Sequence, residues 1–139
     1  MINYRSYIIN ALALSLLFIC LKAFADKPLW EKSSQSDSFK LVIHPEGANY
    51  QIGQYHNWII NIKNVAGEPV NNALISIAGG MMGHGHGLPS QPVVTKILDN
   101  GNYLIEGMLF NMSGEWTLDF HIKTPTVSDR ARFNVELAF

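Results

Sequence analysis

The chain has 139 residues, 47% of them hydrophobic, with 10 Lys and Arg against 11 Asp and Glu and a formal net charge of −1. This length and composition can bury the core of one ordinary domain, and the lack of a basic surplus argues against a nucleic-acid partner. Cysteine occurs once, at Cys20. The sequence therefore excludes a disulfide-stapled scaffold and a cysteine-ligated zinc or blue-copper centre.

The first 25 residues have the three parts of a secretory signal peptide. Arg5 supplies the positive start, an apolar run covers residues 8–19, and Ala23-Phe24-Ala25 fits the small-x-small cleavage pattern. We expect export to the periplasm, with a mature chain of 114 residues that starts at Asp26 and carries a formal charge near −3. An uncleaved signal that anchors the protein in the membrane stays an alternative.

Residues 26–38 are polar and serine-rich, and we expect a flexible lead-in before a single domain over residues 39–139. From there apolar and polar residues alternate in short segments, and Asp99-Asn100-Gly101-Asn102 predicts a tight hairpin turn. About seven short strands and no helical period predict an all-β fold, an immunoglobulin-like antiparallel β-sandwich. The expected strands cover residues 39–44, 50–55, 58–63, 73–78, 93–98, 103–109, 116–122 and 131–137.

The segment Gly79–Pro89 concentrates candidate metal ligands between two of these strands. It places Met81, Met82, His84 and His86 among glycines, which add little to a hydrophobic core. Imidazole and thioether are borderline and soft ligands that suit copper, whereas zinc favours a third histidine or a carboxylate and calcium needs oxygen donors. Adjacent residues in extended chain point to opposite sides, so at most one of the two methionines can reach an ion.

Strand directions predict which distant residues meet this segment. If neighbouring strands pair up and down, the connection that carries Met112 lies at the same end of the sandwich. This count leaves open whether His44, His56 or Met108 contribute, and it places His121 elsewhere, in a structural role. The candidate metal ligands are His84, His86, Met112, Met81 and Met82.

The run Gly83-His84-Gly85-His86-Gly87-Leu88-Pro89, followed by Gly101-Asn102-Tyr103 and by Phe110-Asn111-Met112-Ser113-Gly114-Glu115-Trp116, resembles the core pattern of the YtkA-like domain family, which is related to FixH-type exported proteins. The resemblance covers residues 39–139. It implies a small exported or membrane-anchored β-sandwich associated with copper handling or respiratory-oxidase assembly. His84, His86 and Met112 carry over as ligands, while Asn111 stands where many relatives have a histidine and so removes one candidate ligand.

Two functions of different class follow from these residues. The first is a periplasmic protein that binds copper, as Cu(I) or Cu(II), and handles it or delivers it to a respiratory oxidase. The alternative is a metal-free interaction module that docks on a membrane-protein partner, such as an oxidase-assembly protein, through the same loop. An enzyme is not expected, because the sequence has no nucleophile elbow, paired-carboxylate motif or phosphate loop.

Overall fold

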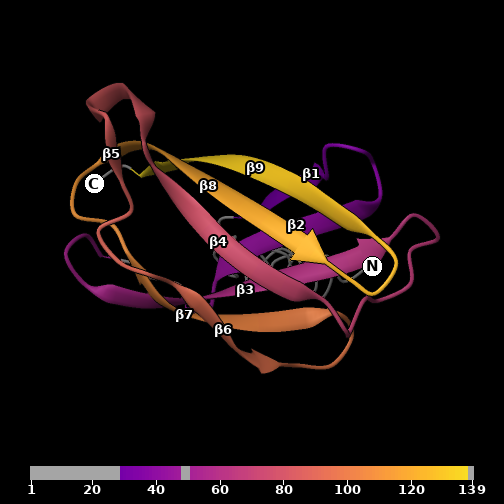
Figure 1. Ribbon diagram of the computed structural model, residues 1–139. Helices are drawn as coiled ribbons and strands as arrows, with labels where there is room; N and C mark the ends of the chain where they lie inside the picture. The colour runs from indigo at the N-terminus through magenta and orange to yellow at the C-terminus, as the bar shows by residue number, and fades with distance from the viewer. Residues whose placement is uncertain (1–28, 48–50, 138–139) are drawn as a thin grey trace, which may run out of the picture.

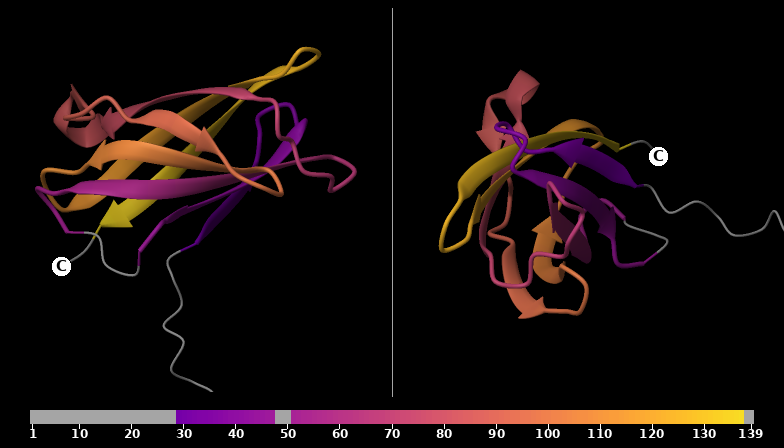
Figure 2. Two further views of the ribbon diagram at one scale, coloured as in Figure 1. Left: turned by 90° about the horizontal axis from the view of Figure 1, so that it is seen from below. Right: turned by 90° about the vertical axis from the view of Figure 1, so that its right-hand side faces the viewer.

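The protein folds into two antiparallel β-sheets that face each other, as the ribbon views show (Figures 1 and 2). The computed structural model describes residues 29–47 and 51–137. The first sheet has the strand order β1-β2-β3-β7-β6, and the second has the order β5-β4-β8-β9. The elements are β1 (Trp30–Ser33), β2 (Phe39–Pro45), β3 (Tyr55–Asn64), β4 (Leu74–Met81), the 3-10 helix η2 (Met82–His84), β5 (His86–Gly87), β6 (Val93–Ile97), β7 (Asn102–Leu109), β8 (Gly114–Lys123) and β9 (Ser128–Leu137). The predicted antiparallel β-sandwich is confirmed, with nine strands in the described residues in place of about seven.

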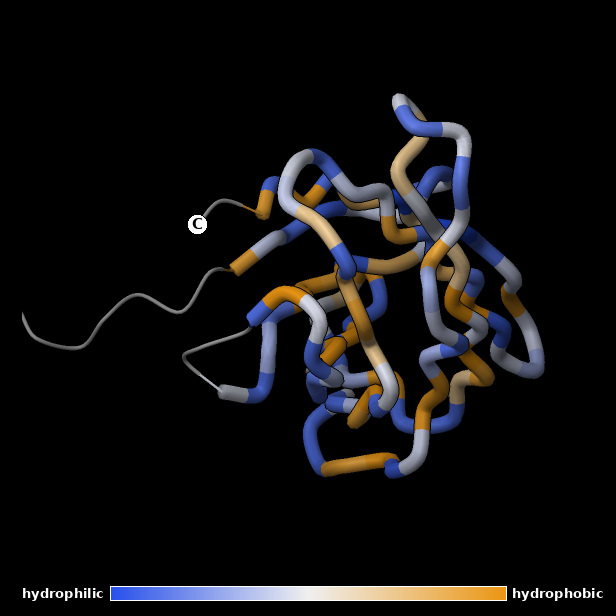
Figure 3. The backbone as a smooth tube through the Cα atoms, turned by 90° about the vertical axis from the view of Figure 1, so that its left-hand side faces the viewer, coloured by the Kyte–Doolittle hydropathy of each residue, from blue (hydrophilic) through white to orange (hydrophobic). Residues whose placement is uncertain are grey.

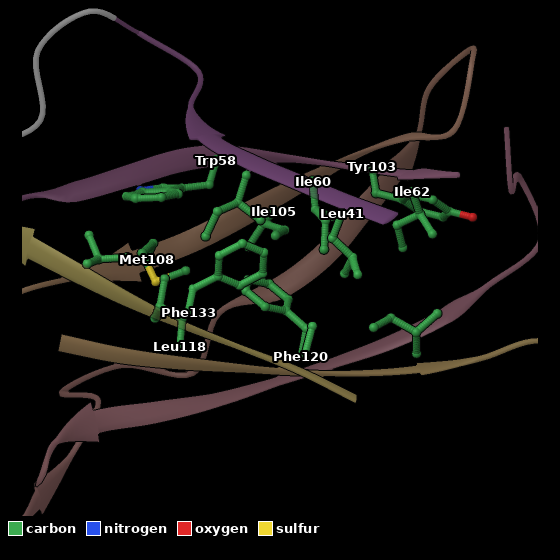
Figure 4. Close-up of a cluster of buried hydrophobic side chains, with 14 of the residues drawn as sticks. Leu41, Trp58, Ile60, Ile62, Tyr103, Ile105, Met108, Leu118, Phe120 and Phe133 are labelled. Atoms are coloured by element: carbon green, nitrogen blue, oxygen red, sulfur yellow. The ribbon is translucent and has the colours of Figure 1, made fainter. Parts of the chain in front are cut away.

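The core lies between the two sheets and follows the alternation in the sequence. Along β9, exposed and buried residues alternate from Ser128 to Leu137, and bands of hydrophobic and hydrophilic residues recur along the strands in Figure 3. Side chains of both sheets point into the interior, such as Trp58 from the first sheet and Phe120 from the second (Figure 4). Each large apolar side chain buried in this way contributes about 1.5–3 kcal/mol. The inward faces are therefore a property of the sequence pattern.

The lead-in expected over residues 26–38 is wrong for its described part. Trp30–Ser33 forms β1 and pairs with β2, with Trp30 opposite Ile43 and Ser33 opposite Lys40. The Trp30 ring stacks on Trp58 with the ring centres 5.5 Å apart. The short strand has no apolar alternation, and it is held to the sheet by its pairing with β2 and by the contact between Trp30 and Trp58.

The signal peptide expected over residues 1–25 lies outside the described residues. Among residues 29–47 and 51–137, no helix is long and apolar enough to cross a membrane.

The strand expected over residues 50–55 is also wrong. Residues 51–54 form a turn, and β3 begins only at Tyr55; Tyr50 lies outside the described residues. Gly53 has a φ of 78°, a left-handed conformation that interrupts an extended strand. Its N–H donates to the carbonyl oxygen of Phe110 (2.8 Å), which ties this turn to the loop after β7.

The hairpin predicted at residues 99–102 is confirmed. It joins β6 to β7, and both Asn100 and Gly101 have positive φ, at 59° and 76°, as a type I′ turn requires. The N–H of Leu98 donates to the carbonyl oxygen of Asn102 (2.8 Å). This turn lies at the end of the sandwich opposite the glycine-rich segment.

Asp129 ties the turn between β1 and β2 to β9. Its carboxylate accepts hydrogen bonds from the backbone N–H groups of Ser36 (3.1 Å), Ser38 (3.4 Å) and Arg130 (2.8 Å). Burial alone raises the pKa of Asp129, but hydrogen bonds from the Ser34 side chain and these N–H groups outweigh it and lower the pKa to about 2. The ionised carboxylate therefore stabilises the contact between the two sheets at this edge.

Candidate metal centre

One end of the sandwich gathers the segments that carry the candidate ligands, at the left of Figure 1. β4 ends at Met81, and its last residues pair with the start of β8, where Gly80 lies opposite Thr117. β7 ends at Leu109, opposite Tyr55 at the start of β3. The short connection from β7 to β8, which contains Met112, therefore lies at the same end as the glycine-rich segment, as the strand directions predict.

The glycine-rich segment is a tight hairpin with a defined register. β4 pairs with β5 through Met81 opposite His86 and Gly80 opposite Gly87. Between them η2 is followed by Gly85, whose φ is 70° and whose N–H donates to the Met82 carbonyl oxygen. The hairpin projects beyond the rest of the sandwich (Figures 1 and 3). Its backbone bonds hold His84 and His86 at fixed places along the turn.

Two of the glycines allow close packing of backbones. A Cβ atom on Gly79 would collide with the carbonyl oxygen of Thr117 in β8, and one on Gly80 would collide with the carbonyl oxygen of His86 in β5. At Gly83, by contrast, a Cβ atom would meet nothing within 4 Å. Gly79 and Gly80 are therefore required by the approach of the neighbouring strands rather than by flexibility of the segment.

The two histidines of the hairpin lie side by side. Their ring centres are 6.0 Å apart with an angle of 71° between the planes. His84 is exposed, whereas His86 is half-buried, with its Nδ1 3.1 Å from the carbonyl oxygen of Gly87. Because a carbonyl oxygen only accepts, Nδ1 of His86 donates in this contact, and Nε2 is the other ring nitrogen. The contact thus orients the ring with Nε2 free to face a metal ion.

The three candidate methionines have different environments. Met82 is 72% exposed at the tip of the hairpin, while Met81 is 4% exposed and belongs to the hydrophobic core. The two adjacent side chains therefore lie on different sides of the chain, one in the core and one in solvent. Met112 is half-buried against the core, and the neighbouring Asn111 is exposed.

Trp116 connects the two segments of the candidate site. Its ring lies against His86 with the ring centres 5.7 Å apart, and its indole N–H donates to the carbonyl oxygen of Met112 (3.1 Å). The side chain is fully buried. In the sequence, Trp116 reads only as a core residue, because its contact with His86 arises when β5 folds back along β4. The structure adds it as the residue that supports both ligand-bearing segments.

The other histidines make separate hydrogen bonds. Nδ1 of His44 donates to the Pro45 carbonyl oxygen (2.8 Å), and Nε2 of His56 donates to that of Gln51 (2.6 Å). His56 lies opposite Met108, which is fully buried. Nε2 of His121, in β8, is within hydrogen-bond distance of the Ser128 hydroxyl at the start of β9 (2.9 Å). Within residues 29–47 and 51–137, no three His, Cys, Asp or Glu side chains form a group that could hold a metal ion. A site at the hairpin therefore needs methionine sulfur or solvent to complete it.

Comparison with known proteins identifies the family. The model of the YtkA-like family matches residues 31–121, a range that includes the hairpin, the Met112 connection and Trp116. No curated protein and no solved structure matches the chain. With most of its length covered by the family model, this chain belongs to the YtkA-like family.

Proposed function

We propose that this protein is an exported copper-binding protein that uses His84, His86 and Met112, for copper handling or delivery to a respiratory oxidase. Membership of the YtkA-like family supports a small exported domain. The donor set supports copper, because the described residues contain no cysteine and the hairpin offers imidazole and thioether groups.

The spacing of the two imidazole rings carries the proposal. A metal–nitrogen bond of about 2 Å places the centre of an imidazole about 3 Å from the ion, so two rings on one ion lie up to about 6 Å apart. The ring centres of His84 and His86 are 6.0 Å apart, within this limit. His84 makes no hydrogen bond in the described part of the chain that would hold its ring away from a shared ion.

The exposure of the three methionines decides which of them is the better candidate for a metal ligand. Met112, half-buried beside Trp116, is the candidate third ligand, while exposed Met82 can reach an ion from the tip of the hairpin. Met81 packs in the core and is the weaker candidate. Copper would pass between proteins by exchange of ligands, for which an exposed His84 and Met82 leave one side accessible.

Copper titration of a double variant tests this proposal. We expect His84→Ala/His86→Ala to weaken Cu(I) binding at least about 100-fold, measured by competition with bicinchoninate, because it removes both nitrogen ligands. A His44→Ala/His121→Ala variant removes two histidines outside the hairpin and is expected to bind as the native chain does. Unchanged affinity in the first variant, or equal loss in both, would contradict the proposal.

The metal-free docking module is the second candidate function, and the shape of the hairpin favours it. The tip projects from the sandwich and exposes a large apolar side chain, Met82. A membrane-protein partner captured in the presence of a chelator, and lost when residues 82–85 are replaced by Ser-Asn-Gly-Ser, would support docking through the loop. Capture that survives the replacement would exclude the hairpin as the docking element.

A further inference from the structure

A concave site lies away from the hairpin, on the second sheet. The groove has a volume of about 580 Å³, within the range of small-molecule sites. It crosses β4, β8 and β9, which lie side by side in Figure 1. Gln35, whose N–H donates to the Arg130 carbonyl oxygen (2.7 Å), brings the end of β1 to its edge. The lining residues are Lys32, Ser33, Gln35, Ser76, Ile77, Ala78, Asp119, Phe120, His121, Arg130, Ala131 and Arg132.

The groove is positively charged in a protein with a surplus of acidic residues. The described residues contain seven Lys and Arg and ten Asp and Glu. Three of these cations, Lys32, Arg130 and Arg132, line the groove, against a single acid, Asp119. Concave surfaces concentrate the field of such charges. The groove therefore attracts anions although the chain as a whole does not.

The charged side chains of the groove are arranged in cross-strand pairs. Arg132 lies opposite Asp119 and donates to both of its carboxylate oxygens, from Nε (2.6 Å) and Nη2 (2.9 Å). The two charges of this pair cancel, and the two hydrogen bonds hold the guanidinium of Arg132 in place. Arg130 lies opposite His121, and neither Arg130 nor Lys32 has an ion-pair partner among the described residues. Two positive charges in the groove thus remain uncompensated.

The neutral part of the lining gives a mixed surface. Ala78 is exposed and supplies an apolar contact beside the charges, and Ser76 supplies a hydroxyl. An occupant therefore has an anionic group together with an organic portion. A bare anion would leave the apolar part of the groove unused.

From this arrangement we propose that the groove binds a small organic phosphate, with Arg130 and Lys32 contacting the phosphate and exposed Ala78 contacting its organic portion. A phosphate monoester carries about 1.5 to 2 negative charges at pH 7, which matches the two uncompensated cations. A guanidinium can donate two parallel hydrogen bonds to such a group. None of the groove residues is a candidate copper ligand, so this site stands independently of the proposed copper function.

Titration calorimetry at low ionic strength with phenyl phosphate as the probe tests the groove. We expect saturable binding that weakens with added salt and falls about tenfold in each of the Arg130→Gln and Lys32→Gln variants. Lys63→Gln is the matched control, because it removes an exposed cation outside the groove and is expected to leave binding unchanged. Circular dichroism checks that all three variants keep the native fold.

Two further arms separate the sources of the phosphate group. Inorganic phosphate is expected to bind more weakly than phenyl phosphate, because it lacks the organic portion. Vesicles of phosphatidylcholine with phosphatidic acid, compared with phosphatidylcholine alone, test whether a lipid headgroup enters the groove; retention on the acidic vesicles that Arg130→Gln abolishes would assign the ligand to the membrane surface. Absence of saturable phenyl phosphate binding, or equal loss in Lys63→Gln, would overturn the proposal.

Discussion

Trp116 supports the candidate metal centre, because its ring contacts His86 and its indole N–H donates to the carbonyl oxygen of Met112. In a Trp116→Phe variant, an aromatic ring still lies beside His86, but the hydrogen bond to Met112 is lost. A hydrogen bond of this kind contributes about 1 kcal/mol, so we expect the Kd for Cu(I) to rise about fivefold, measured by ligand competition.

A Trp58→Phe variant is the control for this prediction. Trp58 is equally buried, and its replacement removes a similar volume from the same core. Its ring packs against Phe110 at the start of the connection between β7 and β8, whereas the ring of Trp116 contacts His86. Both variants are expected to lower the free energy of unfolding by a few kcal/mol. If Trp58→Phe weakens copper binding as much as Trp116→Phe does, the supporting role of Trp116 is refuted.

Asp129 makes the stability of the protein depend on pH in the acid range. Its folded-state pKa of about 2 lies below the ordinary value of 3.8, so its contribution is fully present above about pH 4 and is lost as the pH falls toward 2. The difference corresponds to about 2 kcal/mol. We expect Asp129→Asn to lower the free energy of unfolding at pH 7 by about this amount and to flatten its dependence between pH 4 and pH 2, measured by urea denaturation.

Asp99→Asn is the comparison for Asp129, because it removes an exposed carboxylate in the turn between β6 and β7. It is expected to keep the acid dependence of the native chain. An Asp129→Asn variant with native stability at pH 7 would show that the carboxylate does not hold the turn between β1 and β2 to β9.

At the scale of elements, pairing between β4 and β5 decides where His86 lies. A methyl group on Gly80 would collide with the carbonyl oxygen of His86 and come within 2.7 Å of the Cα atom of Gly87. We therefore expect Gly80→Ala to displace β5 and weaken copper binding at least about tenfold, with changes in the amide NMR signals of residues 86–88. The variant still contains both histidines, so the loss of affinity would come from the displaced position of His86 alone.

Gly83→Ala is the matched control within the same hairpin, because its Cβ atom would have open space and its φ is not positive. We expect its copper affinity to stay within about twofold of the native value. Equal losses in the two variants would mean that the hairpin needs flexible glycines throughout, rather than close contact at one position.

The elements that the sequence predicts best are those whose signal is local. The alternation of Trp116, Leu118, Phe120 and Ile122 is enough to identify β8 and its inward face, because successive side chains of a strand point to opposite sides. The hairpin at Asn100 and Gly101 follows from residues that tolerate positive φ. β1 and the turn at residues 51–54 lack such a signal, and the sequence pattern does not predict either of them.

At the scale of the whole molecule, the strand directions place the glycine hairpin, the Met112 connection and the start of β3 at one end of the sandwich. Only this arrangement brings segments that lie far apart in the chain to the candidate copper site. The cationic groove lies on the second sheet and uses different strand positions. The sandwich therefore offers two separate surfaces, one with soft ligands and one with positive charge.

The sequence by itself determined the β-sandwich, its inward faces and the residue types available for copper, because side-chain period, turn chemistry and donor atoms are local properties. The tertiary structure decided the contact of Trp116 with His86, the groove around Arg130 and the clamp from Asp129 to Ser36, residues 93 positions apart. These contacts depend on how strands from distant parts of the chain are placed side by side. No local pattern records that placement, since it results from the packing of the two sheets as a unit.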